Sequence, residues 1–174
     1  MQNTDRVRIK ICCISSVEEA RMAIRHGASA LGLVSEMPSG PGVIPEETIA
    51  EIVALVPPGV ASFLLTSRRD ADSIIAQQRR TRVNTIQLCD HLTPESHRQL
   101  RKALPGIALV QVVHVTGEES LEEALEAAQR VDAILLDSGN PSLSVKDLGG
   151  TGRTHDWNIS RKIRNSISIP LYLA

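Results

Sequence analysis

Residues 148–157 read Leu-Gly-Gly-Thr-Gly-Arg-Thr-His-Asp-Trp, and they follow a short apolar run, Ala133–Asp137, that reads Ala-Ile-Leu-Leu-Asp. Three glycines in four positions let a backbone approach a ligand closely, and the N–H groups of such a loop before a helix can surround an anion. An apolar run that ends in an acid is typical of a buried parallel strand at the mouth of a barrel. The two stretches together predict a strand and then a phosphate-binding loop, with a flexible surface loop as the alternative.

The same alternation of apolar strands and amphipathic helices extends toward both ends of the chain. Helices are expected between consecutive strands, and a serine at position 15 or 16 followed by Glu18 and Glu19 predicts the cap of the first helix. Repeated strand–helix units indicate a parallel α/β sheet with helices outside it. The expected strands are residues 7–12, 30–34, 61–65, 85–88, 108–115, 133–137 and 170–174.

The fold expected from this pattern is a (βα)8 TIM barrel with about seven strands and six helices present, in one domain over residues 1–174. A doubly wound open sheet is the alternative, but it usually carries its phosphate loop after the first strand. Residues 12–15 (Cys-Cys-Ile-Ser) hold no glycine there. Because the count stops at seven strands, we expect the sequence to lack the last βα unit of a longer chain. We also expect it to be inactive alone, and to aggregate or to complete its barrel through a partner.

Composition excludes several classes of protein. A net charge of −1 and 2% aromatic residues argue against a nucleic-acid platform, and no apolar run is long enough to span a membrane. Residues 1–8 lack the apolar core of a signal peptide, and three cysteines at irregular spacing argue against a disulfide framework. No cysteine or histidine spacing predicts a metal site, and His26, His91 and His97 have the pattern of surface residues. A cytoplasmic location is expected.

Two residues at expected strand ends are the main candidates for chemistry. Alternation along residues 7–12 places Lys10 and Cys12 on one face and Cys13 on the other, so Cys12 should point into the mouth and Cys13 away from it. Lys10 would favour the thiolate of Cys12, or pair with a carboxylate. Asp137 is expected at the mouth, with capping of its own loop or pairing with Arg153 as alternatives.

Four more side chains follow or end expected strands and should approach the mouth. A structural role is favoured for each of them. They are Thr66, Gln87, Cys89 and His114.

Five motifs, taken in order along residues 10–174, resemble the phosphoribosylanthranilate isomerase family. They are Lys10-Ile11-Cys12, Gly27-Ala28 with the strand after it, Gln87-Leu88, Leu135-Leu136-Asp137-Ser138, and residues 149–154 (Gly-Gly-Thr-Gly-Arg-Thr) with Asp156-Trp157. The resemblance implies a (βα)8 barrel of tryptophan biosynthesis. Such an enzyme converts N-(5'-phosphoribosyl)anthranilate to 1-(o-carboxyphenylamino)-1-deoxyribulose 5-phosphate, an Amadori rearrangement that uses no metal and no cofactor.

The resemblance also implies roles for particular residues. Asp137 would be the general acid that protonates the furanose ring oxygen, and Cys12, as thiolate, would be the general base that takes the proton from C2′. Lys10 and Gln87 would contact the sugar phosphate. Part of the phosphate would be held by Gly149, Gly150, Thr151 and Gly152. The expected partner is this small substrate, without nucleic acid or membrane, and the protein would be a monomer or a homodimer.

The chain departs from the family's pattern at three places. Cys13 stands where the family has glycine, and Cys89-Asp90 stands where it usually has His-Gly. Residues 39–44 (Ser-Gly-Pro-Gly-Val-Ile) lack the arginine that holds the anthranilate side, with Gly42 or a neighbour in its place. A related isomerase acting on another aminated sugar phosphate, or an inactive truncated barrel, is therefore the alternative. Arg8, Arg68 or Arg153 would be the substitute for the missing arginine.

Overall fold

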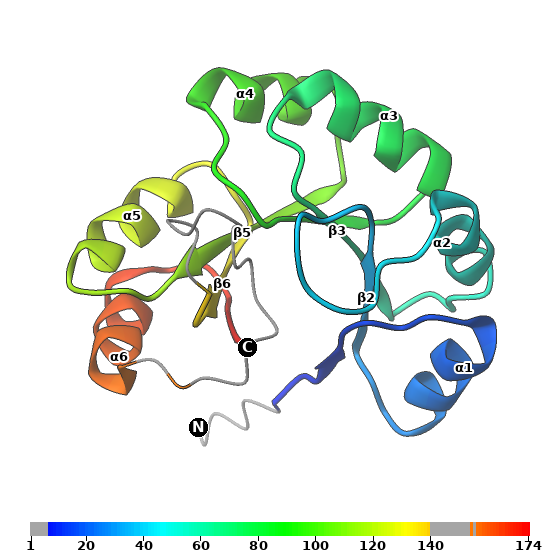
Figure 1. Ribbon diagram of the computed structural model, residues 1–174. Coiled ribbons are helices and arrows are strands. Elements are labelled where there is room, and N and C mark those ends of the chain that lie inside the picture. Colours follow the sequence, from blue (N-terminus) through cyan, green and yellow to red (C-terminus); the bar gives the residue numbers. More distant parts are fainter. Residues whose placement is uncertain (1–6, 140–153, 155) are drawn as a thin grey trace.

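The computed structural model describes residues 7–139, 154 and 156–174, in which strands and helices alternate along the chain (Figure 1). Each strand but the last is followed by a helix, as the sequence pattern predicts. The strands are β1 (Lys10–Ile11), β2 (Ala30–Val34), β3 (Ala61–Thr66), β4 (Thr85–Leu88), β5 (Ala108–His114), β6 (Ala133–Asp137) and β7 (Leu171–Leu173). The helices are α1 (Val17–Arg25), α2 (Glu46–Val53), α3 (Ala71–Thr81), α4 (Pro94–Ala103), α5 (Glu119–Ala128) and α6 (Trp157–Ser166).

The described strands form one parallel sheet in the order β1-β2-β3-β4-β5-β6-β7, so each strand pairs only with its neighbours in sequence. Figure 1 shows the sheet curving so that β1 and β7 are its two edges and the helices lie outside the curve. This arrangement confirms the barrel-type α/β fold expected from the sequence. All carboxyl ends of the strands lie at the same rim, where barrel enzymes carry their active sites.

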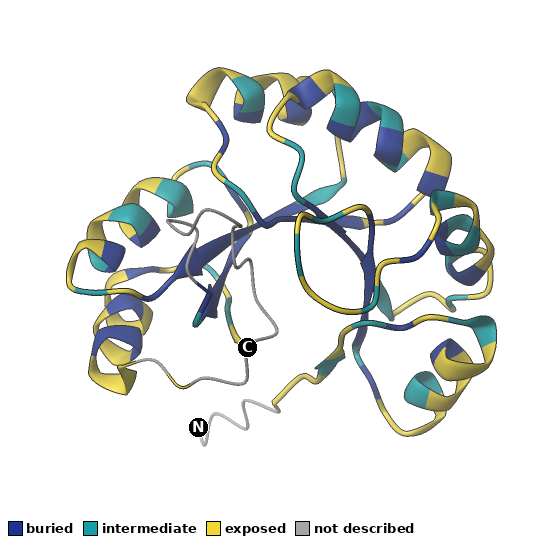
Figure 2. Ribbon diagram, in the orientation of Figure 1, coloured by how far each residue is buried: buried dark blue, intermediate teal, exposed yellow. Residues whose placement is uncertain are grey.

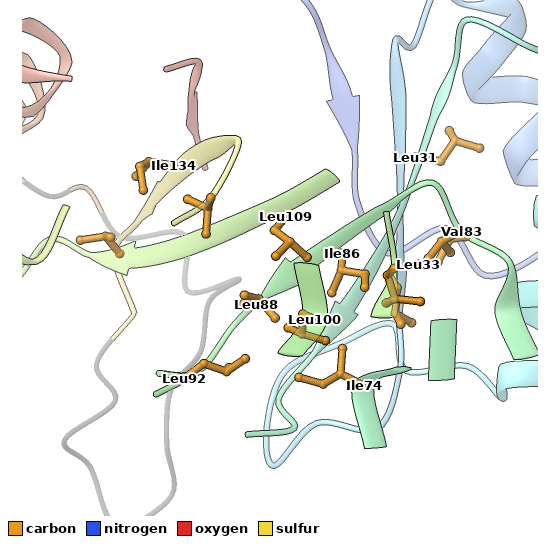
Figure 3. Close-up of a cluster of buried hydrophobic side chains, with 14 of the residues drawn as sticks. Leu31, Leu33, Ile74, Val83, Ile86, Leu88, Leu92, Leu100, Leu109 and Ile134 are labelled. Atoms are coloured by element: carbon orange, nitrogen blue, oxygen red, sulfur yellow. The ribbon is translucent and has the colours of Figure 1, made fainter. Parts of the chain in front are cut away.

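The larger part of the core lies between the sheet and the helices. Figure 2 shows the strands β2 to β6 largely buried and the outward faces of the helices exposed. Leu33, Ile86 and Leu88 of the strands pack with Ile74 of α3 and Leu100 of α4, and Figure 3 shows these side chains together. Burying such residues stabilises the fold by roughly 1.5–3 kcal/mol each, which is why these short strands are continuous apolar runs.

A second, smaller cluster lines the concave inner face of the sheet. Phe63, Leu65, Val110, Val112 and Leu135 belong to it, and each is separated from the outer cluster by the alternation of its strand. Lys10, Cys12, Gln87, Cys89, His114 and Asp137 occupy the same alternating positions on their strands or directly after them. The inner face therefore carries the chemistry-bearing residues, while the outer face carries the main apolar core.

The predicted cap of α1 is confirmed. The side-chain oxygen of Ser16 accepts a hydrogen bond from the N–H of Glu19 at 3.2 Å, while the Glu19 carboxylate accepts from Ser15 N–H at 2.7 Å. The first strand is shorter than the predicted residues 7–12, because the chain turns at Cys13, whose φ is 58°. Ile9 and Ile11 are exposed rather than packed under a helix, because β1 is an edge strand.

Two further predictions from the sequence are wrong. Thr66 does not face the mouth: its hydroxyl donates to Gln77 Oε1 of α3 at 2.7 Å, on the helix side of the sheet. His97, predicted to be a surface residue, is buried at 6% exposure, and its Nδ1 lies 3.0 Å from the carbonyl oxygen of Thr93. It lies three residues before buried Leu100 on the same face of α4, and that spacing was the signal for its burial.

Candidate active site

The side chains of Lys10, in β1, and of Cys12, directly after β1, lie side by side on the inner face. The Lys10 Nζ donates to the Cys12 Sγ at 2.6 Å, and the Cys12 side chain is exposed. A Cβ on Gly32 of the neighbouring strand would lie 2.9 Å from this sulfur and 3.3 Å from the lysine nitrogen. Glycine at position 32 therefore leaves the space that the pair occupies. An ammonium group in contact with a sulfur stabilises its thiolate form, which is the form that takes up protons.

Aromatic residues form the floor below this pair. The Lys10 Nζ lies 5.2 Å from the centroid of the Phe63 ring, a distance that allows a cation–π interaction. The Tyr172 ring of β7 meets Phe63 edge-on, with 5.7 Å between centroids and 77° between planes. The side chains of β1, β3 and β7 thus meet inside the curve of the sheet, which fixes the orientation of Lys10.

Asp137 ends β6 as predicted, and it is 7% exposed. Its Oδ1 accepts a hydrogen bond from the Ser138 N–H at 2.6 Å, so the carboxyl partly caps its own loop, as the sequence alternative proposed. Its register partner on β5 is His114, also 7% exposed, and neither ring nitrogen of His114 has a hydrogen-bond partner within the described residues. A carboxyl and an imidazole therefore lie next to one another at the rim.

Gln87 and Cys89 extend the cluster between these two groups. The Gln87 Nε2 lies 3.6 Å from the Cys89 Sγ, and the buried Gln87 Oε1 has no partner in the described part of the chain. Burial raises the pKa of the Cys89 thiol to about 12, while the charge of Lys10 lowers it and those of Cys12 and Asp137 raise it. These charges act on Cys89 because all four residues surround the same space on the inner face.

Cys13 takes a path that alternation did not predict. Because its φ is 58°, its side chain does not turn to the helix side but packs against the inner-face cluster. Its Sγ lies 3.7 Å from the carbonyl oxygen of Pro41, and burial raises the pKa of its thiol. A Cβ on Gly42, whose φ is +81°, would lie 2.6 Å from the Cβ of Cys13. Cys13 therefore occupies the space that a side chain at position 42 would need.

The loop between β2 and α2 lies over this part of the site. Its residues 35–45 run beside the ends of β2 and β3 (Figure 1), and Val43 pairs with Val34 in an isolated bridge. Arg8 precedes β1, so it belongs to the opposite end of the strands and does not replace the missing loop arginine. The predicted phosphate-binding residues Gly149, Gly150, Thr151 and Gly152, together with Arg153, lie outside the described residues.

Helix α6 begins directly after the segment predicted to bind phosphate. The Asp156 side chain caps it by accepting from the Asn158 N–H at 2.8 Å, and Trp157, the first residue of the helix, is 58% exposed. An amino-terminal helix end presents N–H groups and partial positive charge.

Sequence reasoning missed a polar network beside the site. Thr66 donates to Gln77, and the Gln77 Nε2 donates to Glu46 Oε1 at 3.0 Å. The side chains of Arg68 and Arg80 approach the same carboxylate, with Arg80 Nε at 2.5 Å and Arg68 Nη2 at 4.0 Å. The contacts join residues 11 to 34 positions apart, so no local pattern marked them.

A cavity of about 260 Å³ lies elsewhere, between α4 and α5. Its lining mixes both signs of charge and includes His91, His97, Glu123 and Arg130, with Gln111 from the helix-facing side of β5. It is separate from the inner face. In the described part of the chain, no group of three or more His, Cys, Asp and Glu side chains is placed to hold a metal ion. None of the described helices has the length and apolar character needed to cross a membrane.

The inner-face cluster can move protons in both directions. It combines a thiol in contact with an ammonium group after β1 and a carboxyl at the end of β6, a set of groups suited to paired acid–base chemistry. The carboxyl is buried and the thiol is exposed, so the two groups lie in different environments.

Residues 9–174 match the model of a protein family described as "N-(5'phosphoribosyl)anthranilate (PRA) isomerase". The isomerase named number 2 of Methanosarcina mazei is 36% identical over 169 residues, which cover 97% of this chain and 74% of that protein. Among solved structures, the isomerase of Thermotoga maritima has a TM-score of 0.75 at 28% identity and covers 95% of this chain and 76% of that one. Another isomerase, solved with reduced 1-(o-carboxyphenylamino)-1-deoxyribulose 5-phosphate, has a TM-score of 0.74 at 25% identity, over 97% of this chain and 76% of that one.

Proposed function

Because the chain belongs to the N-(5'-phosphoribosyl)anthranilate isomerase family, we propose that it converts this aminated sugar phosphate to 1-(o-carboxyphenylamino)-1-deoxyribulose 5-phosphate in tryptophan biosynthesis. The family match over residues 9–174 supports the reaction, and the Lys10–Cys12 contact of 2.6 Å is the structural observation that carries the chemistry. The reaction is an internal redox exchange between two adjacent carbons, so it needs proton transfer but no external oxidant.

In the proposed mechanism, Asp137 gives a proton to the furanose ring oxygen. The bond between C1′ and that oxygen then breaks, and the nitrogen lone pair forms a Schiff base with C1′. The position of Asp137 at the end of β6, at the rim where the strands end, supports this role.

Cys12, as thiolate, then takes the proton from C2′. The electron pair of the broken C–H bond moves into a C1′–C2′ double bond, the Schiff base nitrogen becomes a neutral amine, and the resulting enol tautomerises to the ketone. The ammonium of Lys10 supports this role because it stabilises negative charge on the sulfur at 2.6 Å. The Oε1 of Gln87, which has no hydrogen-bond partner among the described residues, is an acceptor available to a sugar hydroxyl.

The phosphate is proposed to bind backbone N–H groups of residues 149–152, close to the start of α6. We further propose a cytoplasmic protein that is a monomer or a homodimer. An isomerase of Thermotoga maritima is described as dimeric, which supports the second of these assemblies.

A second candidate is a related isomerase that acts on another aminated sugar phosphate. The observation that favours it is the Cys13–Gly42 contact, because it leaves no room for the side chain that the family uses to hold the anthranilate carboxylate. The two candidates share the acid, the base and the phosphate loop, and they differ only at the aryl end of the substrate.

Turnover of purified protein with freshly made N-(5'-phosphoribosyl)anthranilate decides between them. The fluorescence of the aryl amine falls as the substrate is consumed, and the product is identified by mass and by chromatography. Conversion to the deoxyribulose phosphate supports the proposed reaction. Failure of this substrate, together with turnover of a phosphoribosylamine that lacks the aryl carboxylate, would support the second candidate instead.

A further inference from the structure

Arg68 stands at the rim of the sheet, two residues after β3 ends at Thr66. Its Nη2 lies 4.0 Å from Glu36 Oε2, in the loop that follows β2, and 4.0 Å from Glu46 Oε1, at the first residue of α2. The guanidinium group therefore lies between the loops that follow β2 and β3. The loop after β2, which Arg68 contacts through Glu36, is the loop in which the family has the arginine that this chain lacks.

The backbone of Arg68 is held by a chain of buried hydrogen bonds. Its N–H donates to Thr66 Oγ1 at 3.2 Å, and the Thr66 hydroxyl donates to Gln77 Oε1 at 2.7 Å. The Gln77 amide continues the chain to Glu46 Oε1, and both Thr66 and Gln77 are at most 1% exposed. Three elements, β3, α3 and α2, thus fix the place from which the arginine side chain starts.

The charges around Arg68 leave its guanidinium group without a strong partner. The Glu46 carboxylate is bonded by Arg80 at 2.5 Å, and that hydrogen bond is the main cause of its lowered pKa. The contacts of Arg68 with Glu46 and Glu36 are longer than a hydrogen bond, and the Glu36 side chain is 88% exposed. The Nε of Arg68 is buried and has no partner among the described residues.

The other described cations near the rim are already engaged. Lys10 contacts Cys12 and the Phe63 ring, and Arg69 lies 3.9 Å from Asp90 and donates to the carbonyl oxygen of His91. Residues 35–45 contain no lysine or arginine. Within the described part of the chain, Arg68 is thus the rim cation with donors still to satisfy.

We propose that Arg68 binds the carboxylate carried by the aromatic ring of the substrate, an inference that rests on the proposed isomerase function. A planar guanidinium group can donate two parallel hydrogen bonds to a carboxylate, which are shorter and stronger than the two 4.0 Å ion pairs it would give up. The proposed phosphate site follows β6, three strands away from β3 along the sheet. The substrate would therefore extend from the β6 side to the β3 side, with its sugar between Cys12 and Asp137.

The test compares two substrates, N-(5'-phosphoribosyl)anthranilate and N-(5'-phosphoribosyl)aniline, which lacks only the carboxylate. The Arg68→Met variant should raise KM for the first substrate by at least about tenfold, the usual loss for a charged hydrogen bond, and change KM for the second by less than about twofold. The Arg68→Lys variant should lie between wild type and Arg68→Met. The matched control is Arg69→Met, which removes a cation from the same loop and should discriminate between the substrates as the wild type does.

Binding gives a reading that does not need turnover. Calorimetric titration with reduced 1-(o-carboxyphenylamino)-1-deoxyribulose 5-phosphate, and with the same compound without its carboxylate, should show a preference that Arg68→Met removes. The proposal would be overturned if Arg68→Met lost the same affinity for both compounds. It would also be overturned if the variant kept the wild-type preference for the carboxylate while its urea unfolding matched the wild type. If the wild type converts neither substrate, the isomerase function fails, while the binding preference still decides the role of Arg68.

Discussion

Cys13 and Gly42 exclude one another's side chains: a Cβ built on Gly42 would lie 2.6 Å from the Cys13 Cβ and 2.8 Å from its Sγ. Cys13 adopts a left-handed conformation with φ 58°, which costs a residue with a side chain on the order of 1 kcal/mol. Its thiol fills the space beneath the loop of residues 35–45. A change at either position therefore acts on the other.

The Gly42→Ala variant should lower the free energy of unfolding by about 2–4 kcal/mol, because it adds a steric clash to the strain of a positive φ. Gly106→Ala is the matched control, since Gly106 has φ +85° but nothing within 4 Å of its Cβ position, and it should lose about 1 kcal/mol. In a Cys13→Gly background only the 3.0 Å approach to the Cα of residue 13 remains, so Gly42→Ala should cost less than it does beside Cys13. Urea unfolding of the four variants gives these values. An equal cost of Gly42→Ala with and without Cys13 would refute the coupling.

Removing either proposed proton carrier should abolish most of the activity. Cys12→Ser and Asp137→Asn should each lower kcat by at least about 100-fold, the usual scale for a general base or acid. Cys13→Ser is the control, because it keeps a side chain of the same shape next to Cys12 and should lose little. If Cys13→Ser is inactive and Cys12→Ser retains activity, the assignment of the base is wrong.

Lys10→Met should slow the alkylation of Cys12 by iodoacetamide at neutral pH. The variant keeps an unbranched stem over Phe63 but removes the ammonium group that contacts the sulfur at 2.6 Å, so the sulfur loses the positive charge beside it. Mass spectrometry of the labelled peptide should show a rate at least about threefold lower. An Arg8→Met variant, which removes an exposed charge two residues earlier, should react at the wild-type rate.

Cys89 should make the protein less stable in alkali. Its thiol has a pKa of about 12 in the folded chain, against about 8.5 when unfolded, so between these values only the unfolded state releases the proton. Stability is unaffected below pH 8.5 and falls as the pH rises, by about 2 kcal/mol at pH 10. In Cys89→Ala this part of the loss should be absent, which unfolding titrations at pH 7.5 and 10 can measure. If the free energy of unfolding falls equally in both proteins between pH 7.5 and 10, the prediction is contradicted.

The ionised carboxylate of Glu46 should stabilise the folded chain at neutral pH, and this stabilisation should be lost in acid. The hydrogen bond from Arg80 lowers the pKa of this carboxyl in the folded chain, so its contribution is present at neutral pH and is lost as the pH falls below about 4. Glu46→Gln should unfold more easily at pH 7 and show a smaller further loss on acidification than the wild type. Glu47→Gln, one residue further along α2 and exposed, is the control. Parallel acid profiles of Glu46→Gln and wild type would exclude the effect.

Most of the fold could be predicted because its central strands, β2 to β6, are buried on both faces. The strands β2, β4 and β6 were predicted at their observed bounds, since each is a short apolar run enclosed by turns and helix caps. Alternation also placed Lys10 and Cys12 on the same face, and in the structure the two side chains are in contact, with Lys10 over the Phe63 ring. It failed at Cys13, because residues other than glycine rarely adopt a positive φ and nothing in the local sequence marks one that does.

The outward direction of Thr66 was within reach of the sequence. Leu64 packs on the helix side, and Thr66 follows it by two positions, so alternation alone would have turned its side chain away from the mouth. The network from Thr66 through Gln77 to Glu46 was not within reach, because it joins three elements through contacts of long sequence separation. Residues 149–152 lie outside the described residues, and their role stays a prediction.

The chain contains a single tryptophan, and the fold places it at a useful position. Trp157 is 58% exposed at the first turn of α6, five residues after the last glycine of the segment predicted to bind phosphate. An indole in such a setting changes its emission when nearby water is displaced or when a charge arrives. The only tyrosine, Tyr172, is held against Phe63 on the inner face, so indole emission can be excited selectively from a well-defined place. The protein thus carries a single indole at the first turn of α6, and its emission offers a way to follow the addition of phosphate.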